Sequence, residues 1–193
     1  ANINNPNFNR HTENINVSAK IRHRNSIIKS KIKLFGLNWD HWGNSSKWSF
    51  RVNIKGFESY RQSKQFNLLV PNTRGYLFDY LINKIAADFN LISIEYYPLH
   101  IDLNGYDKGI YLFEDFFNKY LIEKNHKKDS MIFTRNKNSG KIDINHPKLS
   151  NMSNAQQVLK IYLESNPNEF YQLLDKDKLI VCLAISYLFQ SEH

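Results

Sequence analysis

The chain has 193 residues, of which 41% are hydrophobic and 14% aromatic, so it is long and apolar enough to fold around a core. A single cysteine excludes a disulfide framework and any site built from several thiolates, and we expect Cys182 to be a buried thiol. The formal net charge of +8 favours anionic partners such as phosphates, nucleic acids or lipid headgroups.

Membrane and export signals are absent from the pattern of hydrophobic residues. The longest apolar run, 179–189, is far shorter than the ~20 residues that cross a bilayer, and no charged-then-apolar leader opens the sequence. We therefore expect a soluble chain. Residues 1–16 are polar and rich in asparagine, which is typical of an arm or linker.

In the first half of the sequence, apolar and polar residues alternate as they do in half-exposed β-strands. Residues 17–24 and 28–34 alternate apolar and polar side chains around a short break, which predicts a β-hairpin with its cations on one face, and 47–54 predicts a third strand. Pro71, followed by a candidate N-cap at Asn72 or Thr73, introduces apolar residues at helical spacing. Two further strands then pair through a turn; they are predicted at 93–103 and 109–114.

Beyond residue 115 the pattern changes to mostly helix. The elements expected there are a helix at 116–123, a short strand at 131–134, a polar turn-rich segment at 136–153, a helix at 154–163 and a buried helix at 176–190. We expect an α+β chain in three parts: a linker at 1–16, a region at 17–115 with a five-stranded antiparallel sheet and one helix, and a mostly helical region at 116–193.

Several kinds of chemistry can be weighed from the residues alone. The basic hairpin face is either a solvated surface or an anion-binding surface, and nucleic acid is disfavoured because the aromatic residues are expected in the core. Two pairs, Asp40 with His41 and His100 with Asp102, lack the ligand spacing of a zinc site and are expected to be structural. No nucleophile motif is present, and Cys182 lies within an apolar run.

A linear series of motifs resembles the CotH kinase family, which is named after the spore coat protein H kinase of bacteria. The series runs through Asp40-His41-Trp42, 47–52, 66–71 with Thr73-Arg74, and Asn104-Gly105 through 108–111 to Glu114. The resemblance extends from about residue 17 to residue 193. It implies an atypical protein-kinase-like fold, with an N-lobe of five strands and one helix followed by a helical C-lobe.

The family resemblance also implies an activity, the ATP-dependent and Mg²⁺-assisted phosphorylation of protein Ser or Thr. Lys47 and Arg51, predicted on one face of the third strand, would contact ATP phosphates, and Asp79 would orient one of these cations. Glu114 and Asp115 follow the strand after which a kinase places its adenine-binding hinge. Each of these five residues could equally be an ordinary surface charge or strand end.

The sequence also departs from the family pattern. It has no G-x-G-x-x-G motif, Ser186 stands where related sequences often have Asp, and the catalytic-loop Asn and metal-binding Asp are expected downstream of residue 193. We therefore expect an inactive fragment of a transferase. If the missing part of the C-lobe leaves an apolar surface exposed, we expect self-association through residues 154–193, because the helix at 176–190 would then have lost part of its cover. The alternative is a noncatalytic anion-binding or protein-interaction module with a kinase-like fold.

Overall fold

The computed structural model describes residues 15–36, 39–43, 46–127, 130, 132–135, 142–145, 171–172 and 174–189. The chain divides into two compact units, one made of residues 1–83 with 94–116 and the other of 84–93 with 117–193. The candidate site described below lies entirely within the first unit.

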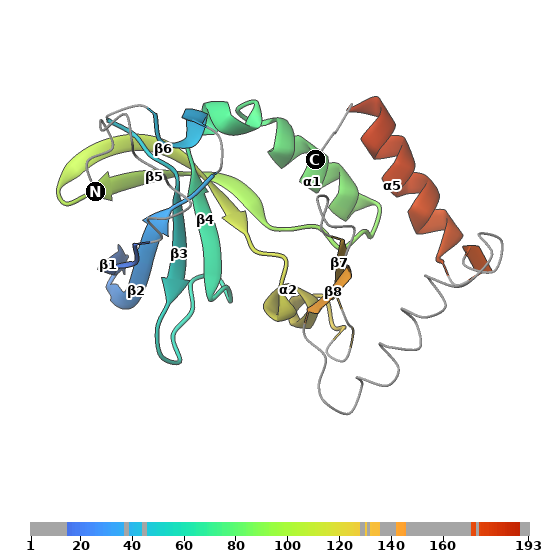
Figure 1. The fold of residues 1–193 in the computed structure, drawn as a ribbon, viewed down its shortest axis with the longest axis horizontal. Helices are drawn as coiled ribbons and strands as arrows, with labels where there is room; N and C mark the ends of the chain where they lie inside the picture. The colour runs from blue at the N-terminus through green and yellow to red at the C-terminus, as the bar shows by residue number, and fades with distance from the viewer. Residues whose placement is uncertain are drawn as a thin grey trace. The chain divides into compact units, whose positions relative to one another are not determined.

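The first unit contains a six-stranded antiparallel sheet with the strand order β1-β2-β3-β4-β6-β5. Figure 1 shows the sheet strongly curled, like half of a barrel, with the long β5–β6 hairpin turned across the direction of β3 and β4. The strands are β1 (Val17–His23), β2 (Ser26–Leu34), β3 (Phe50–Ile54), β4 (Gln65–Leu69), β5 (Tyr96–Leu103) and β6 (Tyr106–Asp115).

Both predicted hairpins are confirmed. Arg24 and Asn25 connect β1 to β2, with Arg24 at a φ of 53°. Asn104 and Gly105 connect β5 to β6 with φ values of 55° and 83°, as a type I′ turn requires at both central positions. Asn and Gly adopt this left-handed backbone at little cost, so the dipeptide fixes the register of the hairpin.

The two faces of the sheet are packed differently. One face carries the main core, in which Val52, Phe66 and Phe113 are almost completely buried and Tyr97 stacks on Phe113 with ring centroids 4.7 Å apart. The other face has a smaller apolar cluster of Leu69, Tyr96 and Leu112, against which Phe35, Tyr80 and Ile94 pack. Polar residues of β2, β3, β4 and β6 on this second face form the candidate site.

The predicted helix exists as α1 (Phe78–Asp88), but it does not begin at Asn72 or Thr73. Those residues lie in a separate 3₁₀ helix, η2 (Pro71–Arg74), in which the Thr73 hydroxyl donates to the Val70 carbonyl oxygen at 2.7 Å. Gly75 and Tyr76, with φ values of 55° and 60°, break the chain direction between η2 and α1. A short 3₁₀ helix, η1 (Trp39–His41), precedes β3.

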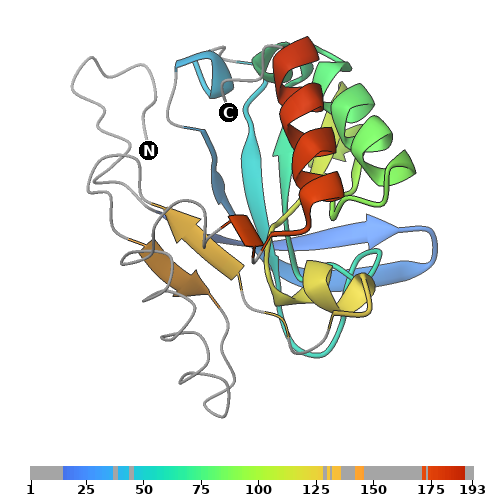
Figure 2. The same cartoon turned by 90° about the vertical axis from the view of Figure 1, so that its right-hand side faces the viewer.

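The second unit contains both helices and strands. Helix α2 (Lys119–Lys124) begins at Asn118, whose side-chain oxygen accepts from the Tyr120 N–H. Strands β7 (Ile132–Arg135) and β8 (Ile142–Asn145) form an antiparallel pair, drawn as two orange arrows in Figure 2. Helix α5 (Lys176–Leu188) begins at Asp175, and the helix predicted at 154–163 falls outside the described residues.

The predicted fold class is wrong. The sheet has six strands rather than five, it is curled into a half-barrel, and the helices described in full, α1, α2 and α5, are short, so the chain is not a kinase-like N-lobe followed by a helical C-lobe. Strand β4 was not predicted because its sequence does not alternate between buried apolar and exposed polar residues. Phe66 and its neighbour Asn67 are both buried. Strand β8 lies in the segment expected to consist of turns.

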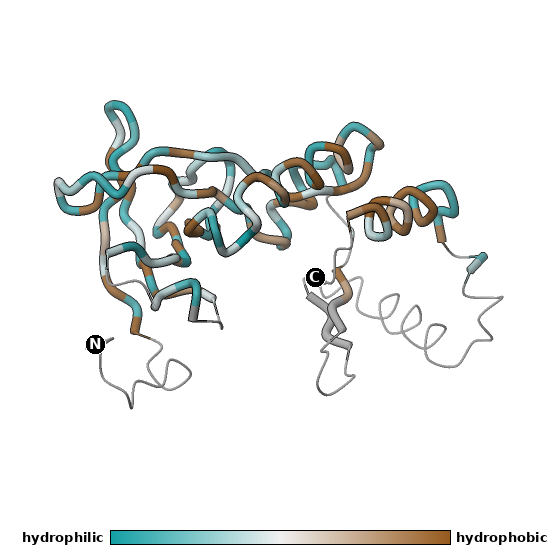
Figure 3. Tube along the Cα trace, turned by 90° about the horizontal axis from the view of Figure 1, so that it is seen from above, coloured by the Kyte–Doolittle hydropathy of each residue, from teal (hydrophilic) through white to brown (hydrophobic). Residues whose placement is uncertain are grey.

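The predicted burial of α5 and of Cys182 is also wrong. Ile185 is the one buried residue of α5, whereas Leu183 is 59% exposed, Tyr187 is 85% exposed and the Cys182 thiol is exposed. Figure 3 shows most of α5 as hydrophobic, with its hydrophilic residues gathered at the first turn. A helix that is apolar on every side usually indicates burial, but composition alone does not supply the cover. No helix in the described part of the chain is long and apolar enough to cross a membrane.

Candidate functional site

A row of polar side chains crosses the second face of the sheet from β2 to β6. Strand register places Lys33 opposite Arg51, Arg51 opposite Asn67, and Asn67 opposite Glu114. Residues directly opposite each other in neighbouring strands project from the same face, so these four side chains follow one line across the sheet. We call them, together with Arg74 and Asp79, the polar row.

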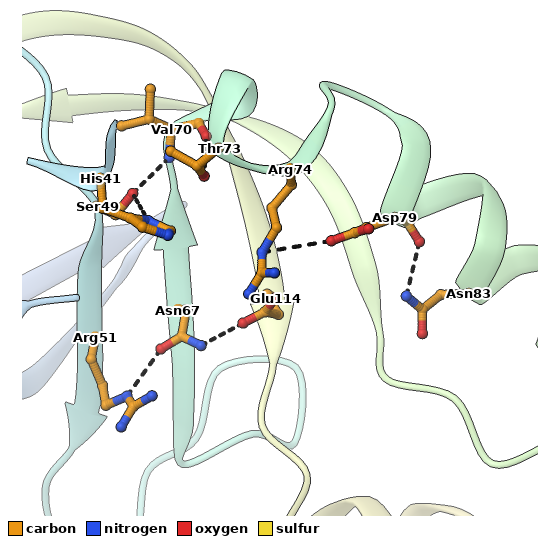
Figure 4. Close-up of polar contacts among 10 residues, drawn as sticks. All are labelled: His41, Ser49, Arg51, Asn67, Val70, Thr73, Arg74, Asp79, Asn83 and Glu114. Carbon is orange, nitrogen blue, oxygen red and sulfur yellow. Dashed lines mark hydrogen bonds and ion pairs between the residues drawn. The ribbon is translucent and has the colours of Figure 1, made fainter. Parts of the chain in front are cut away.

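Hydrogen bonds connect the middle of the polar row (Figure 4). The Arg51 Nε–H donates to Asn67 Oδ1 at 3.1 Å, and Asn67 Nδ2 donates to Glu114 Oε1 at 2.6 Å. Asn67 is only 2% exposed, so these partners satisfy a buried amide that would otherwise be costly. A polar residue is therefore accommodated at the centre of β4.

Arg74 extends the row to the start of α1. Its NH2 group lies 3.4 Å from Glu114 Oε2, and its Nε lies 3.6 Å from Asp79 Oδ2, so one guanidinium lies between two carboxylates. Within the described residues the buried Nε has no hydrogen-bond acceptor, because the contact to Asp79 is an ion pair that is too long to be a hydrogen bond. The turn at Gly75 brings η2 and α1 into this arrangement.

Burial raises the pKa values of two acidic groups in and beside the polar row, Glu114 and Tyr96. Desolvation raises the pKa of the Glu114 carboxyl, while the Arg74 charge and the Asn67 hydrogen bond act in the opposite direction. Tyr96, directly opposite Glu114 on β5, also has a raised pKa, first through burial and then through the neighbouring Glu114 and Asp79 charges. Tyr96 is therefore a neutral phenol at the end of the row.

The cation of Arg51 lies close to two aromatic rings. Its guanidinium carbon is 4.4 Å from the Phe35 ring centroid and 4.9 Å from that of Phe116. Guanidinium groups stack well on aromatic faces because they are planar and weakly hydrated. These contacts hold the cation in a fixed orientation while its Nε–H binds Asn67.

The structure brings together three of the five residues assigned to nucleotide binding. Arg51, Glu114 and Asp79 belong to the polar row. Lys47 does not: its Nζ donates to the Ile110 carbonyl oxygen at 2.7 Å and lies 4.8 Å from the Tyr111 ring centroid. Desolvation lowers the pKa of Lys47, against the opposing effect of the Asp107 charge.

Lys47 and Arg51 were expected on one strand face, but β3 begins at Phe50, so only Arg51 lies within the strand. Lys47 contacts Tyr111, which projects from β6 on the side opposite Glu114 because the two are three residues apart. Asp115 also projects away from Glu114 and is buried, with its Oδ1 accepting from the Phe116 N–H at 2.8 Å.

Three members of the polar row were not assigned to the site from the sequence: Lys33, which was expected only as one of the hairpin cations, Asn67 and Arg74. The signal for Asn67 was a polar residue in the middle of an apolar run, flanked by Phe66 and Leu68. Arg74 occurs in the motif series that resembles the family, next to Thr73, but no role was assigned to it. Asn67 and Arg74 become informative only once strand register places them beside Glu114.

The two His–Asp pairs that were expected to be structural remain outside the row. His100 Nε2 lies 3.0 Å from Asp107 Oδ1, which also accepts from the Gly109 N–H, and Asp102 lies nearby, with ligand atoms of all three within 4.8 Å of one another. All three are exposed. His41 is buried, with Nδ1 3.1 Å from Ser49 Oγ, whereas Asp40 is exposed.

Comparison with known proteins does not assign the chain to a family. No family model and no curated protein matches the sequence.

Proposed function

We propose that the polar row binds the phosphate groups of ATP, as the nucleotide-binding part of a CotH-like kinase that transfers the γ-phosphate to Ser or Thr of a protein. The observation that carries this proposal is the continuous connection from Arg51 through Asn67 and Glu114 to Arg74 and Asp79. The sequence resemblance assigned the first and last of these residues to one nucleotide site, and they belong to one network.

Charge supports phosphate binding at the β2–β3 end of the row. Lys33 and Arg51 are directly opposite each other there, while both carboxylates of the row pair with Arg74 at the other end. Arginine presents several N–H donors in a plane and binds phosphate oxygens in pairs. Phe35 and Phe116 hold the Arg51 group in place, which reduces the entropy lost on binding.

The described residues of the row do not fit Mg²⁺. Glu114 and Asp79 both face the Arg74 guanidinium, and Asp115 projects from the other side of β6. A divalent cation binds oxygen ligands, and a cation between the carboxylates opposes it electrostatically. The role of the row is therefore to bind and orient phosphate through cations.

ATP binding by calorimetry tests the proposal. We expect Arg51→Gln to weaken ATP binding about tenfold or more, since a charge-assisted contact is lost. Arg61→Gln is the matched control, because Arg61 pairs with Glu95 outside the row, and it should leave the affinity unchanged. Unchanged affinity in Arg51→Gln contradicts the proposal, as does a loss confined to Lys47→Ala, which would locate the phosphates near Ile110. Absence of ATP binding to the unmodified chain contradicts it as well and agrees with the noncatalytic alternative.

A further inference from the structure

Strand β1 is an edge of the six-stranded sheet. It pairs with β2 on one side, and no strand within the described ranges pairs with its other side. In a hairpin with a two-residue loop the closing pair, His23 with Ser26, exchanges hydrogen bonds, and such pairs alternate along the ladder. The backbone N–H and C=O groups of Ser18, Lys20 and Arg22 therefore point outward from the sheet edge.

The same edge carries a concentrated positive charge on one face. Lys20 lies directly opposite Lys29, and Arg22 and Lys31 are each two residues further along their strands on the same face. All four are exposed, and no ion pair among the described residues involves them. Like charges opposite each other repel, so an anion bound on this face would stabilise the hairpin.

The other face of β1 is apolar. Ala19 and Ile21 are half-buried, Ile21 packs against the main core cluster, and Val17 is 56% exposed. The edge therefore has cations on one face, apolar side chains on the other, and between them backbone groups with which no described strand pairs. This combination repeats every two residues, which is the period of an extended chain.

We propose that β1 binds an extended polypeptide segment in which acidic and apolar residues alternate, by adding that segment to the sheet as a further strand. Backbone hydrogen bonds to Ser18, Lys20 and Arg22 would supply affinity that does not depend on side chains. Acidic residues of the segment would face Lys20 and Arg22, and its apolar residues would extend the surface of Ala19 and Ile21. The proposal is independent of ATP binding by the polar row.

Two other occupants fit the edge less well. A second copy of β1 would place cations opposite cations, for instance Lys20 against Lys20, which is unfavourable in a strand pair. A nucleic acid strand would use the charge, but the basic face of β1 and β2 has no aromatic side chain on which bases could stack. It would also leave the outward backbone groups of β1 unused.

A pair of labelled peptides tests the proposal by fluorescence anisotropy. One peptide alternates Glu and Val, and the other has the same composition with its Glu and Val residues in two blocks. We expect the alternating peptide to bind at least about tenfold more tightly, because only it can satisfy both faces and the backbone together. Lys20→Gln with Arg22→Gln should weaken its binding about tenfold or more, whereas Lys84→Gln, which lies on α1 and pairs with Asp88, should not.

A backbone variant separates strand addition from simple charge attraction. Ser18→Pro removes one outward N–H without changing the charge, and an edge strand tolerates proline at such a position. We expect Ser18→Pro to weaken peptide binding about tenfold, while Ser18→Ala binds like the unmodified chain. In the unmodified chain, bound peptide should also slow hydrogen exchange at Ser18, Lys20 and Arg22, a measurement that needs no variant to fold.

Each remaining outcome overturns the proposal. If both peptides bind equally, or if Ser18→Pro binds normally and exchange at β1 is unchanged, the face attracts anions without adding a strand. Tighter binding of an oligo-dT probe than of the alternating peptide would identify a nucleic acid surface instead. Failure of the alternating peptide to bind would leave Lys20 and Arg22 as charges that keep the edge from pairing.

Discussion

Asn67 and Glu114 lie directly opposite each other in β4 and β6, and the Asn67 amide donates to the Glu114 carboxylate at 2.6 Å. The amide oxygen is turned the other way, toward the Arg51 guanidinium on β3. A single buried amide therefore connects a cation to a carboxylate across three strands. Its orientation is fixed because only its NH₂ group can donate to Glu114 and only its oxygen can accept from Arg51.

Replacing Asn67 by Ala should destabilise the protein by about 1–3 kcal/mol, because Glu114 loses a donor in a buried position. Urea unfolding measures this change. Asn53→Ala is the control, since Asn53 lies on the same face of neighbouring β3 but is only half-buried, and it should change the free energy of unfolding by less than about 0.5 kcal/mol. If the two variants lose the same free energy of unfolding, the buried hydrogen bond from Asn67 to Glu114 does not stabilise the protein as proposed.

The two ion pairs of Arg74 should contribute unequally. Glu114 has a side chain only 12% exposed, whereas that of Asp79 is 27% exposed, so Glu114 depends more on the cation. We expect Arg74→Gln to cost about 1–3 kcal/mol, because it leaves a buried carboxylate without its cation. Asp79→Asn should lower the free energy of unfolding by no more than about 1 kcal/mol, because the ion pair between Arg74 and Glu114 remains in this variant. Thermal or urea unfolding that ranks the two variants the other way would contradict this account.

Ionisation of Glu114 should make stability depend on pH. Because burial raises the pKa of Glu114 in the folded state above its ordinary value of 4.5, the folded protein holds this proton more tightly than the unfolded chain does. The stabilisation of the folded state by the protonated Glu114 carboxyl is therefore fully present below pH 4.5, and it is lost as the pH rises through the raised pKa. Glu114→Gln cannot ionise, so its stability relative to the unmodified protein should increase across this range. Urea unfolding of both proteins between pH 4 and pH 8 measures the difference, and a difference that is constant with pH would contradict the assignment.

Local patterns in the sequence predicted much of the first unit. Alternation located β1, β2 and β3, although it started β3 three residues too early, and the Asn104-Gly105 turn located the β5–β6 hairpin, because each of these has one apolar face or a turn of distinctive composition. Strand β4 has no such alternation, since its polar residue Asn67 is as buried as its apolar neighbours. The error in the strand count followed from that one element, whereas the curl of the sheet and the low helix content of the described residues account for the rest of the wrong fold class.

The candidate site was predictable only in part, for a related reason. Arg51, Asp79 and Glu114 were identified because the resemblance gave each a role, but their connection passes through Asn67 and Arg74. Those contacts depend on the strand order β3-β4-β6 and on the turn at Gly75, which are long-range features. The resemblance also grouped Lys47 with Arg51 on one strand face, but β3 begins at Phe50, so Lys47 lies outside the strand and contacts the Ile110 carbonyl oxygen.

The exposure of Cys182 can be tested by thiol labelling. Sequence composition predicted a buried thiol, but the structure exposes it on α5. We expect the native protein to react with Ellman's reagent to the extent of one thiol per chain, the single cysteine of the sequence, without added denaturant. Labelling that requires urea would show that this part of α5 is covered in solution.

Two glycines with left-handed backbones should respond very differently to alanine. Gly36, at a φ of 94°, is buried, and a Cβ there would overlap the imidazole of His41, whereas a Cβ on Gly56, at a φ of 70°, would meet open space. The His41 ring cannot easily move aside, because it lies 3.1 Å from Ser49 Oγ and packs edge-on against Phe35. Gly56→Ala should therefore cost only the backbone strain of about 1–2 kcal/mol.

Gly36→Ala should cost about 1–3 kcal/mol more than that, because overpacking adds to the same strain. Urea unfolding of the two variants under identical conditions gives this difference directly, and the backbone contribution largely cancels between them. A loss in Gly36→Ala no larger than in Gly56→Ala would mean that His41 moves freely. The packing of η1 against the start of β3, which holds Ser49 between His41 and the Val70 N–H, would then be looser than the structure shows.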